Sequence, residues 1–273
     1  MFATYAFNGN ASMVQVVADV VALICGGSVA SLSASCNKAL TTVAGAATPY
    51  SAPSAQSFGV VQATCMDGVS KKIFRLVATS NVATLQAYDT WNGATNTGTN
   101  ATTARNCMYL DANPGTLWIV ATDEILAIGM ANTYCGIGFE IKREAPFMVG
   151  TSRPCWGVVT NSAYAPEMPR AKSMTAAGDQ VIVPVYLTSP LNGLTFGFPR
   201  GADDLNYNQM LPCFAMLQYG GYIYAGAIRG AMCGAEAIGA VGDNYTDDIG
   251  RNYLLIKTGA PTPSHKTIAV LRG

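Results

Sequence analysis

Short apolar runs, many of them ended by turns rich in glycine and asparagine, fill most of this 273-residue chain. Turn pairs such as Asp67-Gly68, Asn92-Gly93 and Asn192-Gly193 separate neighbouring runs. The expected strands are Phe58–Cys65, Lys71–Thr79, Val82–Trp91, Thr116–Thr122, Tyr134–Arg143, Cys155–Thr160, Val181–Leu187, Tyr219–Ile228, Tyr253–Lys257 and Thr267–Leu271. This pattern predicts a mainly β protein with a sandwich or barrel-like domain or domains.

The N-terminus has a different pattern, which favours a short helix. Ser12 followed by Gln15 fits a capping box, and apolar residues from Val16 to Ile24 recur at helical spacing. The pair Gly26-Gly27 is a stop signal for that helix.

A second helix is expected to run through Leu32, Cys36, Leu40 and Val43 and to end at Gly45. We therefore divide the chain into an N-terminal helical element at 1–47 and a β-rich domain at 48–273. A candidate break between two subdomains lies in the proline-rich stretch at 148–170. The low-complexity stretch Asn92–Thr103 is expected to be a long loop or arm.

Charge is scarce, and this limits the classes of function. Charged residues make up 12% of the chain, against about 25% in an ordinary soluble domain. The formal net charge is zero and no basic tract occurs, so nucleic-acid binding is disfavoured. The apolar stretch from Met13 to Ile24 is interrupted by Gln15 and Asp19 and is too short to span a membrane, and no signal peptide is recognisable.

No motif for catalysis, a cofactor or a metal is complete. The single histidine, His265, lies in a proline- and serine-rich segment, and no G-x-S-x-G or C-x-x-C motif occurs. Asp243, Asn244, Asp247 and Asp248 could offer oxygens to calcium, but a solvated loop is the favoured interpretation. We therefore expect a protein that is not an enzyme and holds no cofactor or metal.

Two further groups of residues admit more than one interpretation. The eight cysteines are interpreted as buried thiols, with disulfides between subunits as the alternative. The charges of Glu140, Lys142, Arg143 and Glu144 alternate in sign, and we interpret them as a surface ion-pair cluster at a strand end.

Large apolar and aromatic side chains form a candidate interface. We favour a role for these side chains in the core or in contacts with other subunits over a role in stacking on sugars. The candidate interface residues are Trp91, Met210, Phe214, Tyr219, Tyr222 and Tyr224.

Four segments of the chain resemble virion structural proteins of tailed bacteriophages. The matching segments are Asp19–Gly27, Ser33–Ala39, Tyr88–Asn92 and Phe139–Arg143. The resemblance implies packing and no chemistry, so no functional residues are transferred from it. It implies a virion component of a tail, baseplate, neck or fibre connector that contacts copies of itself and other virion proteins.

Other functions stay open beside this expectation. A capsid decoration protein would share the composition, and a receptor-binding, lectin-like module would bind glycans through Tyr222 or Trp91. A polysaccharide depolymerase is the least favoured alternative, because adjacent carboxylates such as Asp247 and Asp248 do not by themselves make a glycosidase site.

Overall fold

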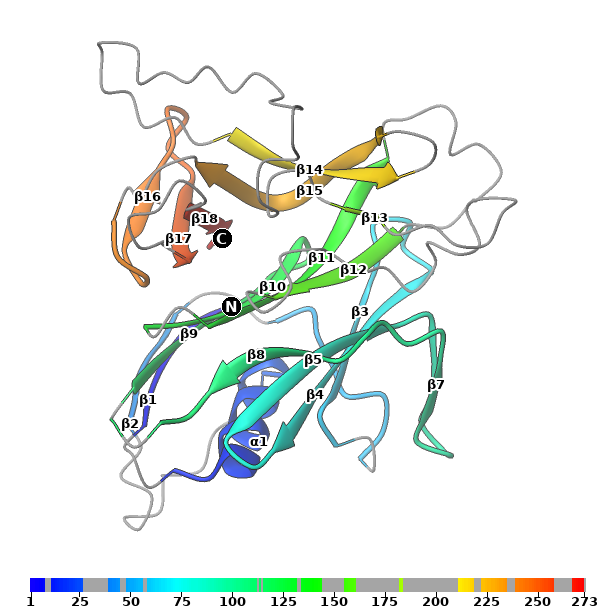
Figure 1. Ribbon diagram of the computed structural model, residues 1–273, viewed down its shortest axis with the longest axis vertical. Coiled ribbons are helices and arrows are strands. Elements are labelled where there is room, and N and C mark those ends of the chain that lie inside the picture. The colour runs from blue at the N-terminus through cyan, green and yellow to red at the C-terminus, as the bar shows by residue number, and fades with distance from the viewer. Residues whose placement is uncertain are drawn as a thin grey trace.

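A computed structural model of the chain shows a mainly β protein, as expected, with a curled antiparallel sheet and a short N-terminal helix (Figure 1). It describes residues 1–7, 11–26, 39–44, 48–55, 58–111, 113, 115–131, 134–143, 155–160, 182–183, 211–218, 222–234, 239–257 and 267–272. Within these residues there is one helix, and all the other regular elements are strands.

The elements in chain order are β1 Phe2–Phe7, α1 Met13–Ile24, β2 Ala39–Ala44, β3 Val60–Thr64, β4 Lys71–Thr79, β5 Val82–Tyr88, β6 Thr90–Asn92, β7 Thr97–Thr99, β8 Arg105–Tyr109, β9 Gly115–Ala121, β10 Ile125–Met130, β11 Cys135–Arg143, β12 Cys155–Thr160, β13 Ile182–Val183, β14 Leu211–Gln218, β15 Tyr222–Gly234, β16 Asn244–Thr246, β17 Asn252–Lys257 and β18 Thr267–Leu271. Every expected strand overlaps an observed one. The stretch expected to be a loop at Asn92–Thr103 contains β7, which pairs with β6 as a hairpin.

Helix α1 begins where its sequence predicts. The Ser12 hydroxyl oxygen accepts a hydrogen bond from the backbone N–H of Gln15, at 3.4 Å. The side chain of Gln15 donates to Asp19 Oδ1 at 2.8 Å instead of returning to the backbone of Ser12. The other carboxylate oxygen of the buried Asp19 accepts from the Tyr5 hydroxyl at 2.7 Å, which ties the helix to β1.

The expected second helix is wrong where the structure describes it. Residues Ala39–Ala44 form strand β2, which pairs antiparallel with β1. Leu32 and Cys36 lie outside the described residues. Strand β1 was not expected either, and its other edge pairs with β9. Long-range strand pairing here overrides a local pattern that suits both helix and strand.

The largest sheet has twelve strands, with the main path β16-β17-β18-β15-β11-β10-β9-β1-β2. It curls so that its two ends approach each other in Figure 1, where the N- and C-termini lie close together. The guanidinium of Arg272, just after β18, lies over the ring of Phe2 in β1 at 3.9 Å. The sheet is therefore a half-barrel and not a flat layer.

A four-stranded sheet, in the order β3-β4-β5-β8, lies together with α1 on the face of the central strands that is opposite the C-terminal strands β16, β17 and β18 (Figure 1). One continuous core joins the helix, this sheet, and strands β1, β9, β10 and β12. Its largest members include Tyr5, Met13, Phe74, Leu117 and Trp156. The indole N–H of Trp156 donates to the backbone carbonyl of Tyr88 at 2.9 Å, which links the two sheets.

Strand β10 is buried on both faces. Leu126, Ile128 and Met130 point into the core shared with the helix, whereas Gly129 lies against Ile256 of β17 on the other side. All six residues of β10 are buried. The C-terminal strands thus cover the back of the central strands and form a third layer over them.

The predicted division at 1–47 and 48–273 stays a prediction, and most of its candidate break at 148–170 lies outside the described residues. Within that stretch, Cys155–Thr160 forms β12, as expected.

Candidate functional site

The structure places only part of the candidate interface. Met210 and Tyr219 lie outside the described residues. Phe214 lies in β14, and Tyr222 and Tyr224 lie two positions apart in β15, where they pair with Gln218 and Met216. The side chains of these strand residues are not among those described. The grouping of these residues as one surface therefore stays a prediction.

Trp91 is the interface candidate whose surroundings are known. Its ring packs edge-on against Tyr88, with 5.0 Å between ring centroids, and the Arg75 guanidinium lies over it at 5.6 Å. Gly98, opposite Trp91 in the β6–β7 hairpin, leaves room for both rings. The Trp91 ring therefore fastens this hairpin to the outer face of β4, and it stays partly exposed.

A buried ion pair joins the two sheets on the opposite face of β4. Lys72 Nζ lies 2.9 Å from Glu140 Oε2, and the two side chains are 1% and 0% exposed. Glu140 Oε1 accepts a hydrogen bond from the backbone N–H of Met66 at 2.8 Å. Lys72 Nζ also donates to the backbone carbonyl of Asp123. The interior thus holds a charged pair whose hydrogen-bonding groups are largely satisfied.

This pair corrects the interpretation of Glu140 as part of a surface cluster. Lys72 shares its strand face with Phe74 and Leu76, both of which are core residues. Glu140 shares its face with Gly136 and Gly138, which also point into that core. The period-two pattern of the two strands was the signal that could have predicted an inward-facing pair. Lys142 and Arg143 lie at the end of β11, as expected, and their side chains are not described.

Tyr50 is a second unusual buried group beside this pair. Its ring lies against Phe74, with centroids 6.4 Å apart, and its hydroxyl has no hydrogen-bond partner in the described part of the chain. Burial raises the pKa of Tyr50 well above its ordinary value, and the charge of Glu140 adds to this shift. The hydroxyl therefore stays protonated next to the Glu140 carboxylate.

The aspartate-rich loop after β15 is used to build a hairpin. Asp247 accepts hydrogen bonds from the backbone N–H groups of Ile249 and Arg251 and pairs with the Arg251 side chain at 2.6 Å. Asp243 accepts from the backbone N–H of Ala240 at 2.8 Å. Among the described residues no group of carboxylate, cysteine and histidine side chains is arranged to hold a metal. Asp203, Asp204 and His265 lie outside the described residues.

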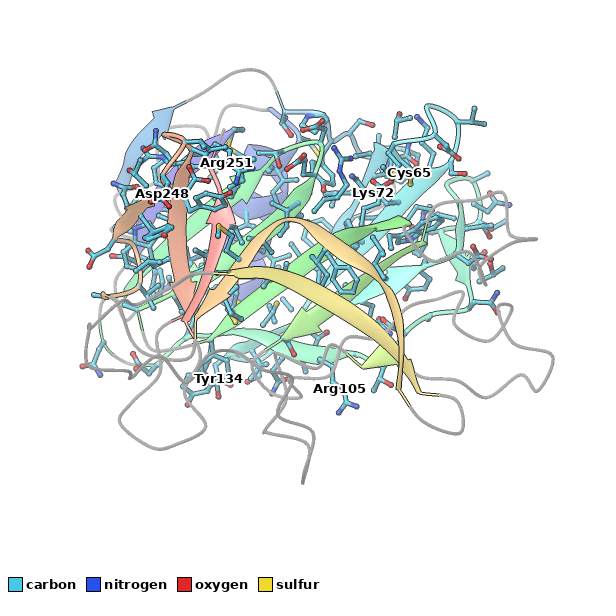
Figure 2. All side chains as sticks on the ribbon, turned by 90° about the horizontal axis from the view of Figure 1, so that it is seen from above. Cys65, Lys72, Arg105, Tyr134, Asp248 and Arg251 are labelled. Carbon is cyan, nitrogen blue, oxygen red and sulfur yellow. The ribbon has the colours of Figure 1, made fainter. Side chains whose placement is uncertain are left out.

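Figure 2 shows Lys72, with Cys65 near it, well separated from Asp248 and Arg251. In the described part of the chain, these two groups of residues therefore do not form one site.

An open hollow of about 410 Å³ lies beside the N-terminus of α1, and the sequence analysis did not predict it. Its polar lining includes Ser12, Ser80, Asn81, Tyr109 and Asp111. Ser80 adopts a left-handed backbone conformation, with φ of 55°, in the turn between β4 and β5. The lining thus contains hydrogen-bonding groups and the Tyr109 ring, which also stacks on Tyr134 with 5.5 Å between the ring centroids.

Several large apolar side chains are exposed. The most exposed are Val69, at 80%, and Ile249, at 76%, and both lie in turns between strands. Val14, Phe58 and Met66 are also about half exposed.

The described cysteines agree with the interpretation as buried thiols. Cys65, Cys107 and Cys135 are buried, Cys25 is partly buried, and none of the four forms a disulfide. The Cys107 thiol donates to the carbonyl of Ala83 at 3.3 Å, and burial raises its pKa well above the ordinary value. Cys107 is therefore protonated and unreactive near neutral pH.

No protein-family model matches this chain, and a search of curated proteins finds no similar sequence. No helix in the described residues is long and apolar enough to cross a membrane.

Proposed function

We propose that this protein is a non-enzymatic structural subunit of a bacteriophage particle, in the tail, baseplate, neck or fibre attachment region. In this proposal it is assembled in the host cytoplasm into the virion, where several copies contact one another and other virion proteins. The observation that carries the proposal is exposed apolar side chains on a chain with only 12% charged residues and no net charge. Copies of a chain with so little charge repel one another only weakly, and burying the exposed apolar side chains in an interface is favourable.

The turn between β3 and β4 is the best-defined contact surface. It presents Met66 and Val69, which are 47% and 80% exposed. Asp67 Oδ1 accepts from the backbone N–H groups of Val69 and Ser70, at 2.9 and 2.8 Å, which fixes the turn. The backbone N–H of Met66 is held by the buried Glu140. An apolar tip held in one conformation loses little entropy when a partner covers it.

Sedimentation velocity at micromolar concentration tests this proposal. We expect the intact chain to self-associate and the double variant Met66→Ser, Val69→Ser to shift toward monomer. Ile249→Ser, which removes an equally exposed apolar side chain from a distant turn, is the matched control. A wild-type chain that stays monomeric would contradict the proposed self-association. Localisation of the chain in purified particles by microscopy would distinguish a tail or neck position from capsid decoration.

The hollow beside α1 favours a lectin-like module as the second candidate function. Its hydroxyl, amide and carboxylate groups and the Tyr109 ring are the groups that bind sugars. We expect a lectin to bind glycans in an array and to lose binding in Tyr109→Ala, whereas Trp91→Ala and Tyr222→Ala test the aromatic residues named from the sequence. If the wild-type chain binds no glycan, the lectin-like function is wrong and only the structural role is retained.

A further inference from the structure

We propose that Lys72 and Glu140 become joined by an isopeptide bond between Lys72 Nζ and Glu140 Cδ, which links the two sheets covalently. The amine nitrogen and the nearer carboxylate oxygen are 2.9 Å apart. The two residues lie 68 positions apart in the chain, in β4 of the four-stranded sheet and β11 of the twelve-stranded sheet. The bond would close a covalent loop across the core and does not depend on the proposed function.

The contacts around the pair match what amide formation needs. The backbone N–H of Met66 donates to Glu140 Oε1, so it stabilises the negative charge that grows on this oxygen when the amine attacks Cδ. The backbone carbonyl of Asp123 accepts from Lys72 Nζ and positions it. The hydrogen bond from Nζ to Oε2 is a direct path for a proton from the ammonium to the oxygen that leaves.

The reaction balances without any co-reactant. One C–N bond forms, the C–O bond to Oε2 breaks, and the ammonium gives up two protons to Oε2, which departs as water. Nothing is oxidised or reduced.

Burial is the reason this pair can react when ordinary surface pairs do not. The two side chains are 1% and 0% exposed, so the reacting groups are held together and water is kept from reversing the step. Two charges buried in the interior also carry a desolvation penalty that their attraction offsets only in part. Converting them to a neutral amide removes both charges and that penalty.

Mass spectrometry of the denatured wild-type chain tests the proposal. We expect the chain to be lighter than its sequence mass by one water molecule, and protease digestion to yield one branched peptide containing both Lys72 and Glu140. Lys72→Arg, which keeps the charge but replaces the primary amine, is expected to have the full sequence mass. The matched control Lys71→Arg changes the neighbouring exposed lysine and is expected to keep the loss.

A wild-type chain of full mass after long incubation in the folded state would overturn the proposal. A water loss that persists in Lys72→Arg, or that maps to other residues, would overturn it as well. If Lys72→Arg does not fold, the branched peptide of the wild-type chain decides the question alone. Self-association is measured separately, so the failure of one proposal does not affect the other.

Discussion

Gly138 shows how much a single residue decides in this core. A β-carbon at Gly138 would lie 2.8 to 2.9 Å from three carbons of the Phe74 ring, and one at Gly136 would lie 2.6 Å from Cys107 Cβ. These contacts show glycine allowing two strands to pack closely, which is a common role of glycine inside a strand. Glycine here brings the two sheets together.

We expect Gly138→Ala to lower the free energy of unfolding by about 1 to 3 kcal/mol, because the added methyl overpacks the ring of a fully buried Phe74. Denaturant unfolding measures this. Phe74→Leu provides the control, since shrinking the ring makes room for the methyl. In the double variant the cost of Gly138→Ala is then expected to fall. Strictly additive costs would show that the Phe74 ring is not the source of the strain.

Tyr50 is a second single residue with a measurable effect, because its raised pKa makes the free energy of unfolding depend on pH. Burial is the largest cause that raises the pKa of Tyr50 above its ordinary value of 10.0, and it acts whether or not Glu140 is joined to Lys72. Above pH 10 the unfolded chain loses this proton while the folded chain keeps it, so the free energy of unfolding falls as pH rises. Tyr50→Phe is expected to lose less stability over this range, and the loss that remains comes from other groups with raised pKa values, such as Cys107.

Denaturant unfolding of both chains from about pH 7 to 11 checks this expectation, because this range includes the ordinary tyrosine pKa of about 10. Near neutral pH, Tyr50→Phe is expected to be at least as stable as wild type, because the hydroxyl has no hydrogen-bond partner in the described chain. If the difference between the two chains does not change with pH, Tyr50 is not the group responsible.

At the scale of the element, α1 is held by both local and distant contacts. Its apolar face, including Val16, Val20 and Leu23, packs into the core. Asp19 lies on the same helix, and it is buried because Tyr5 of β1 and Gln15 donate to its two oxygens. The sequence predicts the helix from spacing alone, but only the neighbouring strand explains how a carboxylate is tolerated on it.

We expect Ser12→Ala to lower the free energy of unfolding by about 1 kcal/mol, because the acceptor for the Gln15 N–H is lost at the helix N-terminus. Thermal or denaturant unfolding measures the change. Ser12→Asp keeps an acceptor and places a favourable negative charge there, so it is expected to match wild type. Equal losses in both variants would mean that the Ser12 hydroxyl does not act as a cap.

The whole molecule is organised by the curl of its large sheet. Curling brings β17 and β18 over β10, and it places Arg272 against Phe2 near the two ends of the chain. In the described part of the chain, the large apolar side chains that stay exposed lie in turns and on the helix and not in one broad face. In the proposed assembly, contact with other subunits would then be made by a small apolar tip, that of Met66 and Val69, and not by a broad face.

If burial of apolar side chains drives the proposed self-association, the dependence of self-association on salt can be predicted. We expect little weakening between low and physiological sodium chloride, and strengthening in ammonium sulfate, because excluded salts favour burial of apolar surface. Light scattering across a salt series measures both responses. A marked weakening in sodium chloride would indicate that charged contacts hold the copies together.

Local patterns determined much of this fold. Lys71–Thr79, Cys155–Thr160 and Thr267–Leu271 have the same bounds in the sequence analysis and in the structure. Their apolar runs and turn residues act over a few positions, and such signals can be read without knowing the partner strand. The N-terminus of α1 is of the same kind, since a cap and its acceptor lie within one turn.

Tertiary structure alone decided what depends on distant residues. Ile125–Met130 was not predicted as a strand, because both of its faces are covered and no alternation marks it. Ala39–Ala44 is a strand because β1 pairs with it. Glu140 appeared to be a surface charge until folding placed Lys72 opposite it. The sequence lists the charges, but burial and pairing belong to the folded chain, since they arise only when residues far apart are brought together.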